Sequence, residues 1–184
     1  MTAPFRCQSL LVLGGARSGK SRHAQRLAES SGLEKLYVAT GEARDAEMAA
    51  RIAQHRADRG PDWQTREEPL ELVAVLRQVR SPGRVVLVDC LTLWLTNAML
   101  AGRDLVSEIA GLAEEVSRPG GPLVLVSNEV GLGIAPATPM GREFRDWQGR
   151  ANQDIARVCE GVVFVAAGLP IRLKPNSDPG IALG

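Results

Sequence analysis

The sequence predicts an α/β fold in which a mainly parallel sheet carries helices on both faces. Short apolar runs without polar alternation recur along the chain, and segments with helical spacing separate them. A glycine-rich motif typical of phosphate binding lies where the first run gives way to the first helix. Strands and helices that alternate in this way form one parallel sheet with right-handed crossovers.

Six apolar runs account for the expected strands. Continuous Val and Leu without alternation are typical of strands that are buried on both faces. The expected strands are residues 10–13, 36–39, 85–88, 123–126 and 162–165, with a last short strand at 171–173.

Six intervening segments are expected to be helices: most place apolar residues on one side at helical spacing, and residues 91–100 are mostly apolar. They are residues 21–30, 46–59, 70–79, 91–100, 105–116 and 142–160. Glycines and prolines in residues 130–139 predict a loop there. No linker or repeat divides the chain, so residues 1–184 are expected to form one catalytic domain with a loosely ordered tail at 175–184.

Composition excludes several classes of protein. The chain has 184 residues, with 22 Lys and Arg against 21 Asp and Glu. This balance gives no basic stripe for nucleic acid or for an acidic membrane surface. No apolar run reaches the roughly 18 residues of a membrane helix. The first residues do not resemble a signal peptide, and three scattered cysteines fit a reducing cytosol, so we expect a cytoplasmic protein.

The motif after the first strand fits G-x-x-x-x-G-K-[ST] and predicts a P-loop. Its members are Gly14, Gly15, Ala16, Arg17, Ser18, Gly19, Lys20 and Ser21. Backbone N–H groups of such a loop surround phosphate oxygens at a helix N-terminus. Lys20 is expected to reach the β- and γ-phosphates and Ser21 to hold Mg²⁺. Arg17 either contacts phosphate or faces solvent, and the residues alone do not decide between these.

Two carboxylates follow later strands. Asp89 ends the expected strand at 85–88, where a P-loop protein holds Mg²⁺ through an acidic residue; capping of the next helix is the alternative. Glu129 occupies the corresponding place after the strand at 123–126. It either orients a substrate hydroxyl or a metal-bound water, or belongs to a surface turn.

His55 lies between Arg51 and Arg59 on one row of the expected helix. Neighbouring cations favour the neutral imidazole, which is its nucleophilic form. The residues alone favour an ordinary half-exposed histidine.

A switch GTPase is excluded because the D-x-x-G match at residues 146–149 falls inside a polar helix and no N-K-x-D motif is present.

Several motifs occur in a fixed order along residues 10–174. They are GGARSGKSRHA at 14–24, EMAARI at 47–52 with His55 and Arg56, Trp63, Thr65 and Glu67, VDCLT at 88–92 with Thr96 and Asn97, SNEVGLGI at 127–134, and FRD at 144–146 with GRANQ at 149–153. This ordered set resembles the bifunctional adenosylcobinamide kinase / adenosylcobinamide-phosphate guanylyltransferase family.

The resemblance implies a RecA-like P-loop NTPase fold and two reactions of cobalamin biosynthesis. A nucleoside triphosphate, ATP or GTP, phosphorylates adenosylcobinamide, and GMP from GTP is then transferred to the resulting phosphate through a histidine. His55 matches that histidine, and Lys20 is expected to assist. Nucleotide contacts carry over onto the P-loop and onto Ala39, Thr40, Gly41, Arg56, Ala57, Asp58, Arg59, Glu67 and Asp89. The resemblance also implies a homotrimer.

Three other functions stay open at this stage. A kinase of another small molecule needs the P-loop but not His55. A nucleotide-binding module would bind GTP without turnover. A RecA-type motor on DNA lacks the basic surface that nucleic acid requires.

Overall fold

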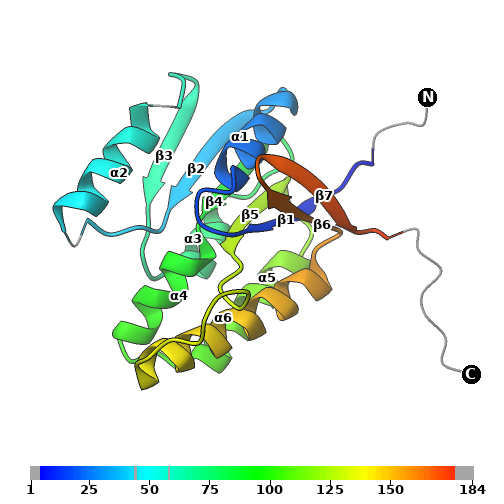
Figure 1. The fold of residues 1–184 in the computed structure, drawn as a ribbon. Coiled ribbons are helices and arrows are strands. Elements are labelled where there is room, and N and C mark those ends of the chain that lie inside the picture. The colour runs from blue at the N-terminus through cyan, green and yellow to red at the C-terminus, as the bar shows by residue number, and fades with distance from the viewer. Residues whose placement is uncertain (1–4, 44, 58, 177–184) are drawn as a thin grey trace, which may run out of the picture.

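The structure is a computed structural model that describes residues 5–43, 45–57 and 59–176. Seven strands form one sheet in the order β3-β2-β4-β5-β1-β6-β7 (Figure 1). Their bounds are β1 (Ser9–Gly14), β2 (Glu34–Ala39), β3 (Trp63–Glu67), β4 (Arg84–Asp89), β5 (Leu123–Asn128), β6 (Gly161–Ala166) and β7 (Leu169–Lys174). All neighbouring strands pair in parallel except β6 and β7, which are antiparallel. The expected, mainly parallel sheet is confirmed.

In the described part of the chain six helices connect the strands, and more of them pack on one face of the sheet than on the other. Their bounds are α1 (Lys20–Ser30), α2 (Ala46–Ala57), α3 (Leu72–Val79), α4 (Leu91–Leu100), α5 (Leu105–Ser117) and α6 (Pro139–Val158). Ala24 and Ala28 of α1 pack with Val12 in one buried cluster. Buried side chains of α3 to α6 pack in a larger cluster on the other face. The glycine-rich motif at the start of α1 therefore lies on the face with the smaller helix layer, opposite the layer of α3 to α6.

Strand register decides which residues meet at the carboxyl edge of the sheet. Gly14 pairs with Asn128, and Asp89 pairs with both Val126 and Ala39. The ends of β1 and β4 are therefore not neighbours, because β5 lies between them. Parallel α/β sheets bind ligands at this edge, where strand order reverses.

One strand and the start of the last helix differ from the sequence-based expectation. β3 was not expected; it is a polar edge strand, so it lacks the apolar run that marks the other strands. α6 begins at Pro139 rather than residue 142, because Thr138 caps it by accepting a hydrogen bond from the N–H of Gly141 at 3.1 Å. Residues 177–184, most of the expected tail, lie outside the description.

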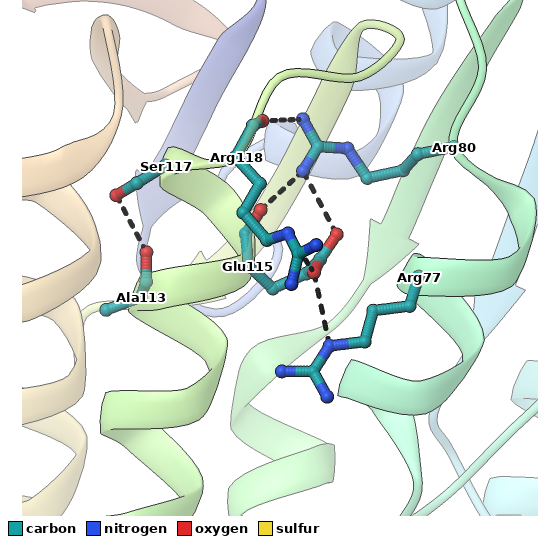
Figure 2. Close-up of polar contacts among 6 residues, drawn as sticks. All are labelled: Arg77, Arg80, Ala113, Glu115, Ser117 and Arg118. Atoms are coloured by element: carbon teal, nitrogen blue, oxygen red, sulfur yellow. Dashed lines mark hydrogen bonds and ion pairs between the residues drawn. The ribbon is translucent and has the colours of Figure 1, made fainter.

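At the amino edge of the sheet a buried carboxylate joins α3 to α5. Oε1 of Glu115 lies 3.3 Å from Nη1 of Arg80, and Oε2 of Glu115 lies 3.4 Å from Nε of Arg77 (Figure 2). Arg80 also donates to the carbonyl of Arg118 at 3.2 Å. This cluster lies at the opposite edge from the glycine-rich loop. Within the described part of the chain, no helix is both long and apolar enough to cross a bilayer.

Candidate functional site

The glycine-rich loop joins the end of β1 to the start of α1, as the motif requires. A Cβ on Gly14 would lie 2.5 Å from Oγ of Ser18 and 2.5 Å from the carbonyl oxygen of Val165. Gly19 has a φ of 95°, in the left-handed region that favours glycine. The N–H of Gly168, in the turn between β6 and β7, donates to the carbonyl of Ser18 at 2.8 Å. Two glycines and the neighbouring turn thus fix the shape of the loop.

Lys20 opens α1 and folds back over this loop. Its side chain is buried, and Nζ donates to the carbonyl of Gly15 at 3.1 Å. An ammonium in this place carries positive charge into the concave side of the loop, where phosphate oxygens would bind. Ala16 and Arg17 are exposed at the tip of the loop, and Ser21 follows Lys20 in the first turn of the helix.

Asp89, the last residue of β4, is held by a tyrosine of the neighbouring strand. The hydroxyl of Tyr37 donates to Oδ2 of Asp89 at 3.1 Å. Burial and the nearby Asp89 carboxylate raise the pKa of Tyr37 far above its usual range, so its hydroxyl stays protonated and remains a donor. This hydrogen bond orients the Asp89 carboxylate through Oδ2, and Tyr37 does not contact Oδ1.

The segment that follows β2 is fixed beside Asp89. Thr40 is fully buried, and its hydroxyl donates to the carbonyl of Cys90 at 2.7 Å and accepts from its N–H at 2.9 Å. The side-chain amide of Asn97 donates to the carbonyl of Thr40 at 2.8 Å. Strand pairing places Ala39 opposite Asp89, and these contacts fix Thr40 beside Cys90, with Gly41 next along the chain. Burial, with Asp89 beside it, raises the pKa of Cys90 to about 11, so the thiol is neutral.

Cations at the end of α2 contact the strands at this edge. Arg56 pairs with Glu67, the last residue of β3. The guanidinium of Arg59 lies 3.6 Å from the centre of the Tyr37 ring, a cation–π contact. Trp63 meets the same ring edge-on, with centroids 6.2 Å apart. Arg59 therefore contacts the tyrosine that donates to Asp89, and Arg56 contacts the last residue of β3.

His55 belongs to α2, but its side chain lies outside the described part of the structure, and so does Asp58 entirely. Ala57 is exposed at the last position of the helix. The nucleophilic role of His55 therefore stays a prediction of the sequence.

A buried polar network supports the end of β5, between the two halves of the site. Ser127 donates to Oδ1 of Asn152 at 2.7 Å, and Gln148 donates to both at 3.0 and 3.1 Å. Asn152 in turn donates to the carbonyl of Asn128 at 3.0 Å. The network ties α6 to β5, which fixes the residue that follows, Glu129. The N–H of Glu129 donates to the carbonyl of Gly14 at 3.1 Å, and its Oε1 accepts from Gly131 at 2.7 Å.

Oxygen donors at the site suit Mg²⁺. This ion is usually held through one or two carboxylates together with substrate phosphates and waters. The Asp89 carboxylate and the Ser21 hydroxyl are donors of that kind, and the hydrogen bond from Tyr37 orients the first. Among the described residues no group of three or more His, Cys, Asp and Glu side chains is placed to hold a metal by itself.

Sequence reasoning did not identify Tyr37 or Gln148 as site residues. Tyr37 is the single tyrosine of the chain and stands within an apolar strand, which was a usable signal. A buried tyrosine hydroxyl needs a partner, and at this edge a strand-end carboxylate is the natural one. Gln148 gave no comparable signal, because it is one of many polar residues in its helix.

Comparison with known proteins gives a consistent result. The family model described as cobinamide kinase / cobinamide phosphate guanyltransferase matches residues 10–173. A Pseudomonas aeruginosa protein named bifunctional adenosylcobalamin biosynthesis protein CobP is 52% identical over 166 residues, 89% of this chain and 96% of that protein. An Escherichia coli protein named bifunctional adenosylcobalamin biosynthesis protein CobU is 39% identical over 180 residues, 90% of this chain and 99% of that protein.

Solved structures resemble the chain in fold alone. A Pyrococcus horikoshii protein aligns with a TM-score of 0.51 and 12% identity, covering 95% of this chain and 90% of that one. An ATPase of a bacterial type III secretion system aligns with a TM-score of 0.52 and 11% identity, covering 90% and 56%. The chain therefore shares its fold with an ATPase, as expected for an α/β chain with a P-loop motif.

Proposed function

The chain belongs to the cobinamide kinase / cobinamide phosphate guanyltransferase family, and from this membership we propose the two reactions that it catalyses. It phosphorylates the aminopropanol hydroxyl of adenosylcobinamide with ATP or GTP. It then transfers GMP from GTP to adenosylcobinamide phosphate, giving adenosyl-GDP-cobinamide and pyrophosphate. The observation that carries the proposal is the family match over residues 10–173. The P-loop agrees with it, because buried Lys20 donates to the carbonyl of Gly15 within the loop.

In the first reaction the acceptor hydroxyl oxygen bonds to the γ-phosphorus and the bond to the nucleoside diphosphate breaks. Lys20 and the loop N–H groups bind the phosphates and stabilise the charge that develops on them. Ser21 and Asp89 would hold Mg²⁺, which supplies further charge neutralisation on the phosphates when bound. Tyr37 keeps the Asp89 carboxylate in place for that role.

In the second reaction a ring nitrogen of His55 bonds to the α-phosphorus of GTP and pyrophosphate leaves. An oxygen of adenosylcobinamide phosphate then bonds to the same phosphorus, which frees the histidine. Attack needs the neutral imidazole, since a protonated ring has no free lone pair. Arg56 and Arg59 support this role because they bring positive charge from the end of α2 to the nucleotide edge of the sheet.

We further propose that the enzyme works as a cytoplasmic homotrimer.

A kinase without guanylyl transfer is the second candidate. Its support is that the described contacts center on the P-loop, Lys20 and Asp89, all of which serve phosphoryl transfer. The two candidates differ in whether GMP becomes attached to the protein.

Incubation with α-labelled GTP and Mg²⁺ separates them. We expect label on the wild-type protein that is labile in acid and stable in base, as a phosphorus–nitrogen bond to histidine requires. His55→Ala should abolish the label, whereas His23→Ala, the matched variant of the chain's other histidine, should retain it. Lys20→Ala should weaken both reactions. A wild-type protein that binds GTP but takes up no label would leave only the kinase.

A further inference from the structure

A groove runs down the α6 side of the sheet from the P-loop edge. It has a volume of about 460 Å³ and lies between α6 and the strands β1, β6 and β7. Its wall on α6 is a stripe of four residues at helical spacing, Gly149, Asn152, Gln153 and Ala156. Ligand sites of proteins have volumes of about 300–1,000 Å³, so the groove can hold a substantial part of a small molecule.

The upper end of this groove joins the nucleotide site. Leu13 and Glu129 line it there, and Gly14, the first P-loop glycine, follows Leu13 directly. The N–H of Glu129 donates to the carbonyl of Gly14 at 3.1 Å. Oε1 of Glu129 is used by Gly131, while Oε2 has no partner among the described residues. A molecule in the groove would therefore present one end to the P-loop, beside a carboxylate oxygen that can accept a hydrogen bond.

The lining combines apolar walls with fixed polar groups. Leu13, Val162 and Leu173 supply apolar surface from three strands. Lys174 closes the lower end, where Nζ donates to the carbonyls of Ala156 and Arg157 at 3.1 and 2.9 Å. Its charge therefore already serves the end of α6. The charge of the groove is low below Glu129, which suits an uncharged, partly apolar ligand rather than a second nucleotide.

One amide in the lining is available to a ligand. Asn152 is buried and uses its side chain within the network under β5. Gln153 is exposed at the groove and has no hydrogen bond to another described residue. A side-chain amide both donates and accepts, so it can pair with an amide of a ligand.

We propose that this groove binds the corrinoid acceptor, with the acceptor hydroxyl placed at Glu129. Cobinamide has an apolar macrocycle, a rim of neutral amides and one arm that ends in a hydroxyl, which matches an apolar groove with a free amide and a carboxylate at its P-loop end. The macrocycle is larger than the groove, so one edge and the arm enter. Beyond Glu129 the chain exposes Leu132 and Ile134, by 80% and 99%, as further apolar surface for the rest of the ring. This inference rests on the proposed function.

Filling the groove tests the assignment. A Cβ on Gly149 meets nothing within 4 Å, and leucine is the better helix former, so Gly149→Leu should fold. Leu173→Trp narrows the groove from β7 instead, so the test does not depend on a single substitution in α6. Glu143→Leu is the matched control, since it adds the same side chain on an exposed position of α6 outside the lining.

The measurements are the KM for cobinamide in the kinase reaction, cobinamide binding by equilibrium dialysis, and GMP labelling, which uses no corrinoid. Both groove variants should raise the KM and the dissociation constant at least tenfold and retain labelling, while Glu143→Leu changes none of them. Wild-type affinity for cobinamide in both folded groove variants would overturn the groove assignment alone. A wild-type enzyme that labels and binds nucleotide yet never phosphorylates cobinamide would overturn the proposed function and, with it, the assignment.

Discussion

Replacing Glu115 with alanine removes the carboxylate that Arg77, Arg80 and Arg118 contact at the amino edge of the sheet. The side chains of Glu115 and Arg80 are 5% and 4% exposed, and they are 3.3 Å apart (Figure 2). Arg80 retains its hydrogen bond to the carbonyl of Arg118 but loses its counter-charge. The variant therefore leaves a buried guanidinium without a neutralising partner.

An uncompensated buried charge of this kind costs about 3–5 kcal/mol of the free energy of unfolding. The surroundings do not easily absorb it, because a Cβ on Gly120 would already lie 3.0 Å from Nε of Arg80. For a domain of this size that cost corresponds to a fall in Tm of roughly 6–20 °C. Native domains have about 5–15 kcal/mol in total, so the variant should fold but with little reserve.

Urea unfolding followed by circular dichroism measures this cost. Arg77→Ala is the matched control, because Arg77 contacts the same carboxylate at 3.4 Å but is 49% exposed. Its loss should cost at most about 1 kcal/mol. GTP affinity of folded Glu115→Ala should match the wild type, since the cluster lies at the edge opposite the P-loop. A loss no greater than that of Arg77→Ala would refute the account of a buried, uncompensated charge.

Three other outcomes concern the site itself. Gly14→Ala should weaken GTP binding by at least about tenfold while Gly15→Ala does not, because a Cβ would lie 2.5 Å from other atoms at the first position and within 4 Å of none at the second; equal losses in a binding titration would contradict this. Tyr37→Phe should raise the Mg²⁺ concentration for half-maximal activity about tenfold, through loss of the hydrogen bond to Asp89. The same variant should also lower the thermal stabilisation by Mg²⁺ with nucleotide, and an unchanged metal requirement would argue against this role. Because the pKa of Cys90 is about 11 in the folded chain against 9.0 when exposed, the free energy of unfolding should fall between pH 9 and 11; urea titrations in which it rises would exclude this.

Much of the fold follows from local sequence, because most of the strands are buried on both faces and carry continuous apolar runs. β3 escaped detection for the opposite physical reason. It lies at the edge of the sheet, and its residues Gln64, Thr65 and Glu67 are exposed. β3 forms because it pairs with β2, and the hydropathy pattern of its five residues does not predict that pairing.

The site divides in the same way. The P-loop is contiguous in sequence, so its motif predicts both its place and its shape. The bond from Tyr37 to Asp89 joins residues 52 apart, and it depends on the register between β2 and β4. The separation of Asp89 from the P-loop by β5 is likewise a property of strand order rather than of spacing. His55 remains a prediction from the sequence resemblance.

Under the two proposals, strand order lets one nucleotide site serve two acceptors. α2, which carries His55, connects β2 to β3 at one end of the sheet, and β7 lies at the other end, with the P-loop between them (Figure 1). The groove is lined by residues of β1, β6 and β7. Under the two proposals, the histidine and the corrinoid hydroxyl approach the bound triphosphate from opposite ends of the carboxyl edge. The histidine would react at the α-phosphorus and the corrinoid hydroxyl at the γ-phosphorus, so approach from two sides would avoid competition for one path in these two steps. Filling the groove should therefore impair the corrinoid reactions and leave the histidine reaction unaffected.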